Sequence, residues 1–372
     1  MTTTLPADHA ERLARARLSL EGLSFGDAFC SQFFTRRVYD HHFAARSIPP
    51  GPWMYTDDTV MALSIYEGLA RHGAIDQYEL AREFGRRYVA DIYRGYGPAA
   101  HGILRDIHLG TPWRNVSNAV FNGTGSMGNG GAMRVAPIGG YFADDLARDF
   151  ARRYVADVYR GYGPAAHGIL RDIHLGTPWR NVSSAGFGGT GSMGNGGAMR
   201  VAPIGGYFAD DLGRVAKEAD ASAEVTHAHP EGRAGAVALA VAAACAFQMR
   251  GKEVARGDLL RPAIEYTPKG KTRDGLLAAL ALNPAAKIED VVVLLGNGSK
   301  VTAPDTVPLA VWLAERHAGD LPAGLWAVVE AGGDVDTVGA MVGGVVALHA
   351  PHTIPPTWFR LREPLALDEK QP

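Results

Sequence analysis

A 66-residue segment of this chain occurs twice in direct succession. Residues 80–145 recur as residues 146–211, so that "YVADIYRGYGPAAHGILRDIHLGTPWRNVS" returns as "YVADVYRGYGPAAHGILRDIHLGTPWRNVS". A solenoid needs about three or more diverged units that stack on one another. Two nearly identical copies in an otherwise unrepeated chain indicate a recent tandem duplication, and we expect one domain, residues 1–372, in which one copy is surplus to the core. The copies differ only at Glu83/Asp149, Gly85/Ala151, Ile92/Val158, Asn118/Ser184, Val120/Gly186 and Asn122/Gly188.

The composition excludes several classes of protein. Of the 372 residues 47% are hydrophobic and 20% are charged, and the formal net charge of -2 gives no electrostatic footprint for nucleic acid or an anionic membrane. Two cysteines, Cys30 and Cys245, do not make a disulfide framework, which favours a cytoplasmic location. The N-terminal segment lacks the apolar core of a signal peptide. The longest apolar run, residues 234–247, is too short to span a bilayer and predicts a buried helix.

Helical periodicity dominates outside the repeat. Apolar residues share one face at helical spacing in residues 61–69, 309–313 and 338–345. Only "VVVLL", residues 291–295, has the composition of a strand, and so short a run cannot be assigned from its period. We therefore expect an all-α architecture.

Two acidic clusters stand where apolar helices are expected to start. "YTDDTV" (55–60) and "GGDVDTVGAMVGG" (332–344) each carry two aspartates and a threonine hydroxyl, with no lysine or arginine within four residues of the acids. Taken singly, each cluster is explained by capping, because Thr and Asp are favoured at helix N-termini. If the two helix starts meet, however, four carboxylates cannot all stay ionised without a cation. Hard oxygen donors suit Mg²⁺, Mn²⁺ or Ca²⁺ better than a structural zinc.

Five motifs, in this order, resemble the ADP-ribosylglycohydrolase family. They are "GDAFC" (26–30), "PPGPWMYTDDTVMA" (49–62), "GNGGAMRVAPIG" (128–139 and again 194–205), "THAHPEG" (226–232) and "GGDVDTVGAMVGG" (332–344). The resemblance extends from about residue 18 to about residue 364, with one copy of the repeat left over. It implies a compact single-domain orthogonal helical bundle with a dinuclear site for Mg or Mn. It also implies a hydrolase that removes ADP-ribose from a modified protein or small molecule by cleaving the glycosidic bond at the ribose anomeric carbon.

The resemblance further implies which residues form the site. The expected metal ligands are Thr56, Asp57, Asp58, Asp334, Asp336 and Thr337, and Asp57, Asp58 or Asp336 would serve as the catalytic base. A glycine loop, residues 191–196 in the second copy, would lie along the diphosphate and distal ribose of ADP-ribose, since backbone N–H groups in such loops bind anions well. The substrate-binding residues would be Gly191, Ser192, Met193, Gly194, Asn195 and Gly196, with His227 at a phosphate and Phe187 on the adenine. A place in the core is the alternative for His227 and for the phenylalanine. The first-copy equivalents of this set are Gly125, Ser126, Met127, Gly128, Asn129, Gly130 and Phe121.

The chain also departs from the family pattern. Glycine is usual where Cys30 stands, and many members carry a glutamate shortly after "GDA", where this chain has Gln32 and no acid. A catalytically weakened or non-catalytic ADP-ribose-binding member is therefore a second hypothesis. A nicotinamide-dependent dehydrogenase is a third, because "GTGSMG" matches G-x-G-x-x-G. That fingerprint needs a preceding strand in a βαβ unit, and "SNAVFN" is a poor strand.

The connections of the two copies distinguish them. The first copy follows directly from the helix after "TDDT", and the second runs directly into "THAHP". We therefore expect the start of the first copy and the end of the second to occupy the native positions, with "GTPWRNVS" at the crossover. The sequence does not distinguish Arg, Ser, another residue or a small molecule as the acceptor that carries the ADP-ribose. It also does not indicate an oligomeric state.

Overall fold

The computed structural model describes residues 5–74, 83, 87, 193–224, 227, 229–283 and 285–365. Within these ranges every regular element is an α-helix or a short 3-10 helix, and the only extended pairings are two isolated bridges, Trp53 with Arg362 and Gly194 with Thr302. The all-α expectation is confirmed. None of the described helices is both long and apolar enough to cross a membrane.

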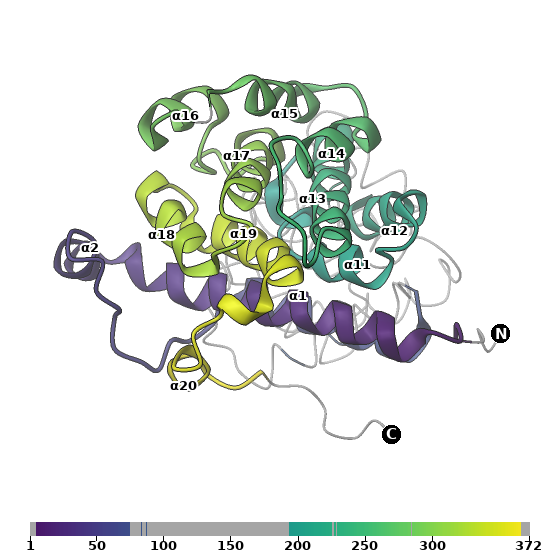
Figure 1. Ribbon diagram of the computed structural model, residues 1–372, viewed down its shortest axis with the longest axis horizontal. Helices are drawn as coiled ribbons and strands as arrows, with labels where there is room; N and C mark the ends of the chain where they lie inside the picture. The colour runs from purple at the N-terminus through teal and green to yellow at the C-terminus, as the bar shows by residue number, and fades with distance from the viewer. Residues whose placement is uncertain are drawn as a thin grey trace, which may run out of the picture.

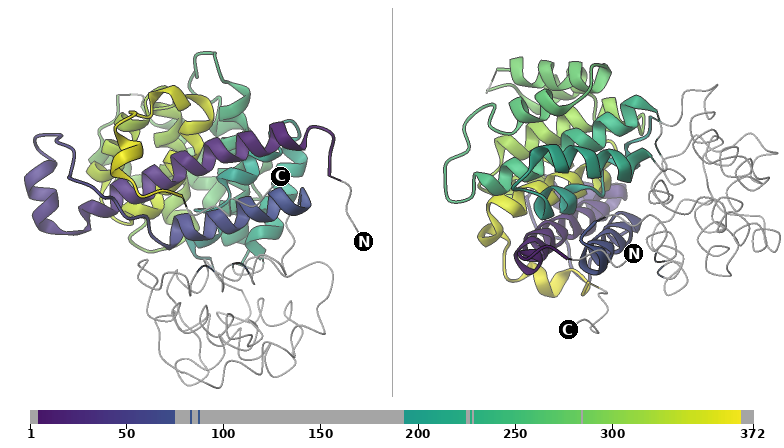
Figure 2. Two further views of the ribbon diagram at one scale, coloured as in Figure 1. Left: turned by 90° about the horizontal axis from the view of Figure 1, so that it is seen from below. Right: turned by 90° about the vertical axis from the view of Figure 1, so that its right-hand side faces the viewer.

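One long helix lies beneath most of the others. Figure 1 shows α1 along the long axis of the molecule, with α15 and α16 at the opposite edge, and Figure 2 shows α3 alongside α1. The N-terminal elements are α1 (His9–Cys30), η1 (Ser31–Phe34), α2 (Arg36–His42) and α3 (Asp57–His72). The later elements are η2 (Asn195–Gly197), α11 (Ala202–Tyr207), α12 (Leu212–Glu224), α13 (Pro230–Gln248), α14 (Leu260–Tyr266), α15 (Lys271–Ala281), α16 (Ile288–Leu295), α17 (Ala303–Arg316), α18 (Leu321–Ala331), α19 (Val335–His349), η3 (Pro351–Thr353) and α20 (Trp358–Leu361).

The helical periods of the sequence correspond to observed helices. The three apolar faces lie in α3, α17 and α19, and the apolar run 234–247 lies in α13, which is buried over most of its length. The ambiguous "VVVLL" run belongs to α16, where Val291 and Leu295 face the core and Val293 and Leu294 are exposed. Because the buried pair is separated by four residues, the run follows the helical period even though all its side chains are apolar.

Helices α1 and α19 lie with their backbones almost in contact. A Cβ built on Gly26 of α1 would lie 1.9 Å from the carbonyl oxygen of Gly339, and one on Gly22 would lie 2.1 Å from that of Gly343. Neither position has room for a side chain. Gly339 and Gly343 thus give α19 a smooth face toward α1. Since Gly339 lies about one turn after the start of α19, the contact also holds the acidic start of that helix against α1.

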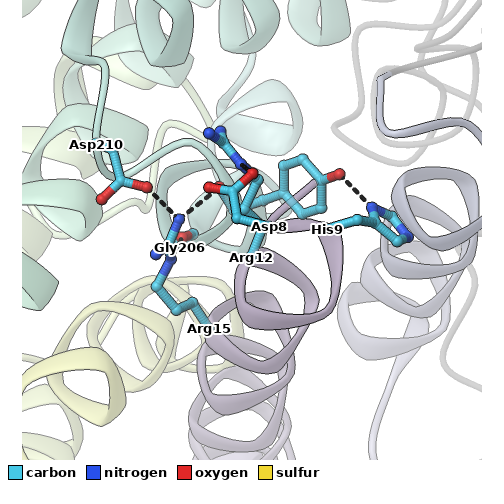
Figure 3. A network of polar contacts seen from close by, with 7 residues as sticks. Asp8, His9, Arg12, Arg15, Gly206 and Asp210 are labelled. Atoms are coloured by element: carbon cyan, nitrogen blue, oxygen red, sulfur yellow. Dashed lines mark hydrogen bonds and ion pairs between the residues drawn. The ribbon is translucent and has the colours of Figure 1, made fainter. Parts of the chain in front are cut away.

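The end of the second repeat copy is bonded to α1. Figure 3 shows Arg15 beside Gly206 and Asp210, and His9 beside a tyrosine ring, that of Tyr207. Arg15 donates to the carbonyl oxygens of Gly206 (3.0 Å) and Tyr207 (3.2 Å) and pairs with Asp210 at 2.5 Å. The Tyr207 hydroxyl lies 2.6 Å from Nδ1 of His9. The segment directly before α12 is thus fixed to the N-terminal helix.

The start of the first copy meets α3 through buried charges. Arg87 forms ion pairs with Glu67 of α3 and, at 2.9 Å, with Glu83. Arg71 of α3 also pairs with Glu67, at 3.3 Å. Glu83 and Arg87 are the first-copy residues that the structure describes, and both are buried against α3.

Candidate metal and ADP-ribose site

The acidic start of α3 is capped by a residue from another helix. Asp27 of α1 accepts hydrogen bonds from the backbone nitrogens of Thr56 (2.9 and 3.0 Å) and Thr59 (3.1 Å), and from the Thr59 hydroxyl at 2.6 Å. The Thr56 hydroxyl, at the N-cap position, donates to Asp58 Oδ2 at 3.0 Å. These amides are therefore satisfied by Asp27 and not by the carboxylates of Asp57 or Asp58. Capping alone does not explain the two adjacent acids.

The acidic start of α19 is joined to the glycine loop. Asp334 is the N-cap residue of α19, but its side chain makes no capping hydrogen bond. Its Oδ2 instead accepts from Nδ2 of Asn195 at 2.8 Å, and the same nitrogen donates to the Thr306 hydroxyl at 3.1 Å. Asp336 accepts the backbone N–H of Thr337 at 2.8 Å. The second-copy loop and the acids of α19 are thus directly connected.

The two acidic helix starts meet. The Thr337 hydroxyl lies 3.4 Å from Asp58 Oδ1. Burial raises the pKa of Asp58 well above its usual range, and the negative charges of Asp336 and Asp27 raise it further. Burial likewise raises the pKa of Asp336 well above its usual range, with Asp334 and Asp27 adding to the shift. The carboxylates therefore lie close enough to oppose one another's ionisation.

Two further pKa values show the same effect in a weaker form. Burial raises the pKa of Asp27 to about 6, although the hydrogen bonds from Thr59 and Thr56 oppose the shift. Burial also raises the pKa of Asp334, and the hydrogen bond from Asn195 lowers it.

The donor set suits a divalent cation. Among the described residues, none of the groups that most strongly shift the pKa values of Asp58 and Asp336 is a lysine or arginine. Buried carboxylates without a cationic neighbour are destabilised when ionised, and a bound cation removes that penalty. Carboxylate and hydroxyl oxygens are ligands that Mg²⁺ accepts. In the described part of the chain, however, no three His, Cys, Asp or Glu side chains are gathered closely enough to hold one ion.

The glycine loop is fixed from both sides. Met193 accepts the backbone N–H of Ala303 at 2.8 Å, and the backbone nitrogen of Asn195 donates to the carbonyl of Val301 at 3.2 Å. From within the core, the buried Arg200 donates to the carbonyl of Gly196 at 2.9 Å. Burial lowers the pKa of Arg200 to about 9. The described residues of the loop, 193–196, are thus joined by hydrogen bonds to the core.

His227 lies directly behind this loop. A Cβ built on Gly197 would lie 3.3 Å from the His227 ring, and the imidazole is fully buried. Burial, together with the charge of Arg200, lowers the pKa of His227 well below its usual value, so the imidazole is neutral. The side chain of Asn195 is also buried and is directed to Asp334, so we interpret Asn195 as a residue that positions this acid. The predicted Gly191, Ser192 and Phe187, and the first-copy set Gly125, Ser126, Met127, Gly128, Asn129, Gly130 and Phe121, lie outside the described residues.

Sequence reasoning did not identify Asp27 or Thr306 as part of the site. The available signal for Asp27 was a single acid in the otherwise apolar stretch "LSFGDAFC". Of the two departures from the family pattern, Cys30 is the last residue of α1 and Gln32 lies in η1, which follows directly. Cys30 fills the space beside Gly339, where a Cβ would lie 2.7 Å from its sulfur. The Gln32 side chain donates to the carbonyl of Ala28 at 2.9 Å.

In the absence of divalent cations, we expect the protein to be more stable at about pH 5.5, below the folded pKa of Asp27 of about 6, than at about pH 8. Asp58 and Asp336 have raised pKa values when folded, and a carboxyl of this kind contributes stability that is fully present below its unfolded pKa and is lost as the pH rises through its folded pKa. The lowered pKa of His227 acts in the opposite direction below its usual value of 6.5, because only the unfolded chain then takes up the proton. Melting temperatures in a chelator at the two pH values test this expectation, and a lower value at the lower pH would contradict it.

The comparisons with known proteins agree with these motifs. The family model described as ADP-ribosylglycohydrolase matches residues 8–156 and 140–369, and the two matches overlap where the repeat copies join. The ADP-ribosylhydrolase ARH3 of Gallus gallus is 31% identical over an alignment of 249 residues that covers 58% of this chain and 66% of that protein. The ARH3 of Homo sapiens is 34% identical over an alignment of 160 residues that covers 38% of this chain and 44% of that protein. The aligned parts thus span less than two thirds of both relatives.

The fold also has a counterpart among solved structures. A chain from an "ADP-ribosylglycohydrolase-related protein complex" superimposes with a TM-score of 0.54 at 22% identity, covering 95% of this chain and 94% of that chain. At this identity the comparison shows a shared fold. The family model, in contrast, matches nearly the whole sequence and includes both acidic helix starts. This chain therefore belongs to the ADP-ribosylglycohydrolase family.

Proposed function

We propose that this protein is a divalent-metal-dependent hydrolase that releases ADP-ribose from a modified acceptor by cleaving the glycosidic bond at the ribose anomeric carbon. The proposal depends most on one observation, the meeting of the two acidic helix starts through Asp58 and Thr337, with Asn195 joining the glycine loop to Asp334. The substrates would be ADP-ribosylated proteins or small ADP-ribosylated molecules.

The same group of acids would bind the metal ions and supply the catalytic base. The proposed ligands of two Mg or Mn ions are Thr56, Asp57, Asp58, Asp334, Asp336 and Thr337. Such ions, when bound, lower the pKa of a water molecule and orient it for attack. One of Asp57, Asp58 and Asp336 would take up the proton of the attacking water, and the remaining carboxylates would stabilise the positive charge that develops on the sugar ring. The backbone of the glycine loop would hold the diphosphate, with the buried His227 supporting the loop from behind.

The test is a release assay on two kinds of substrate. Peptides carrying ADP-ribose on serine or on arginine are incubated with the protein in a chelator, in Mg²⁺ and in Mn²⁺, and free ADP-ribose is measured. We expect release only with a metal. A second candidate is a non-catalytic protein that binds ADP-ribose, and the replacement of the acid near position 32 by Gln32 favours it. Binding of ADP-ribose without release in any condition would support this candidate. The dehydrogenase hypothesis is wrong, because it required a βαβ unit and the family is all-α.

We also propose that the chain forms one domain in which the loop of the second copy serves the site. Asn195→Ala removes the hydrogen bond to Asp334 and should lower turnover by about 10- to 100-fold, the usual effect of losing a partner of a metal ligand. Asn129→Ala alters the same residue of the first copy and should leave turnover unchanged. Steady-state rates of the two variants provide the comparison. Equal losses would indicate that the copies exchange, and the reverse ranking would assign the loop to the first copy.

A further inference from the structure

Two buried acids in this fold cap a helix to which they do not belong. Asp27 of α1 accepts Thr56 N–H, Thr59 N–H and the Thr59 hydroxyl at the start of α3. Glu231 of α13 accepts Lys271 N–H (2.6 Å), Thr272 N–H (2.8 Å) and the Thr272 hydroxyl (2.7 Å) at the start of α15. In each case one carboxylate accepts hydrogen bonds from two backbone N–H groups and one threonine hydroxyl. A single threonine supplies two of these three donors. The two arrangements are chemically matched.

The two capped helices differ in what their first turn carries. The first turn of α3 contains Asp57 and Asp58, which are among the proposed metal ligands, whereas that of α15 contains the single acid Asp274. In an isolated helix the N–H groups of the first turn need acceptors, and a side chain of the same segment usually provides one. In a capping box, the side chains of the N-cap residue and of the third helical residue each accept the backbone N–H of the other. Asp27 accepts both of these N–H groups, those of Thr56 and Thr59, from outside the helix.

Neighbouring residues of α1 hold both acidic helix starts. Because Gly26 has no side chain, the backbone of α19 can contact it at Gly339. The next residue, Asp27, accepts hydrogen bonds from backbone N–H groups at the start of α3. Both residues are completely or almost completely buried, and Asp27 is 0% exposed. One turn of α1 therefore fixes α3 and α19 relative to each other, and with them the Asp58 and Thr337 side chains that meet between the two helices.

We propose that Asp27 is the positioning residue of the metal site: it caps α3 from α1 and so holds the helix start that carries Asp57 and Asp58, the proposed ligands of divalent cations. The inference rests on the proposed function in that it takes the acids of α3 and α19 as metal ligands. In this proposal Asp27 is not itself a metal ligand. Its carboxylate acts through the hydrogen bonds to Thr56 and Thr59.

The experiment compares Asp27→Asn with Glu231→Gln. Each change replaces a capping carboxylate by an amide of the same shape, whose nitrogen is a donor and faces other donors. Both variants should therefore melt at a temperature a few degrees below that of the unaltered protein in a chelator. Mn²⁺ binding is then measured by calorimetry on the folded proteins. Asp27→Asn should weaken Mn²⁺ binding by about 10- to 100-fold, and Glu231→Gln should leave it unchanged.

A milder variant covers the case in which Asp27→Asn does not fold. Thr59→Val removes one of the donors to Asp27 and keeps the carboxylate, and it should weaken Mn²⁺ binding by a few-fold, on the scale of a single lost hydrogen bond. Thr272→Val is the matched control at α15. Equal Mn²⁺ affinity in each variant and its control would overturn the role of Asp27 while leaving the metal site in place. Absence of Mn²⁺ binding by the unaltered protein would overturn the proposed metal site and this inference together.

Discussion

Asp336→Asn is expected to lower turnover by about 10²- to 10⁴-fold and at the same time to raise the melting temperature of the metal-free protein. The asparagine keeps the size of the side chain but removes one of the buried negative charges that raise the pKa of Asp58. Without a metal, that repulsion opposes folding. With a metal, the same carboxylate is a proposed ligand and a candidate base. Its loss should therefore stabilise one form of the protein and inactivate the other.

The measurement pairs ADP-ribose release in Mn²⁺ with thermal unfolding in a chelator. Asp320→Asn is the control, because Asp320 also stands at a helix start but caps its own helix, accepting Ala323 N–H at 2.9 Å. Asparagine caps about as well as aspartate, so this variant should match the unaltered protein in both measurements. If Asp336→Asn keeps full turnover, or melts at a lower temperature in the chelator, then Asp336 does not have the role proposed for it.

The second large effect is expected on stability, from Gly26→Ala. The new Cβ would lie 1.9 Å from a backbone oxygen of α19, which is too close for any rotamer to relieve. The two helices must therefore separate, and we expect the free energy of unfolding to fall by about 3 kcal/mol or more, at the upper end of the range for overpacked cores. Because the contact also holds the start of α19, metal binding should weaken in any fraction that folds.

Gly68→Ala provides a control with the opposite sign. Gly68 lies inside α3, and a Cβ there would meet no atom of the described residues within 4 Å. Alanine favours the helix over glycine by about 0.5–1 kcal/mol, so this variant should be more stable than the unaltered protein. Denaturant unfolding of both variants measures the two effects. A Gly26→Ala protein as stable as Gly68→Ala would show that α1 and α19 do not require the glycine contact.

The parts of this structure that the sequence predicts are the local ones. The period of apolar residues places α3, α13, α17 and α19, and the acids and threonines mark the starts of α3 and α19, because these signals lie within a few neighbouring residues. The run in α16 was ambiguous for a local reason as well, since five apolar residues in succession do not reveal which of them face solvent.

What the sequence does not predict depends on partners distant in the chain. Asp27 caps Thr59, 32 residues away, and Asn195 reaches Asp334, 139 residues away. No local pattern shows that a carboxylate on α1 serves α3, or that an amide in a glycine loop turns into the core. The repeat adds a different limit, because residues 127–145 and 193–211 are identical. Only the direct continuation of the second copy into α12 distinguishes them.

The glycine contact between α1 and α19 also sets an order of events during synthesis. Ser19 of α1 donates to the carbonyl of Gly344, 325 residues later, at 2.8 Å. A chain emerging from the ribosome therefore presents the glycine face of α1 long before α19 exists to cover it. The aspartates of α3 likewise precede those of α19 by most of the chain. A nascent chain that stops before Asp334 has the acids of α3, whose helix start Asp27 of α1 can hold, but lacks those of α19. The site is therefore completed only as the last helices are released.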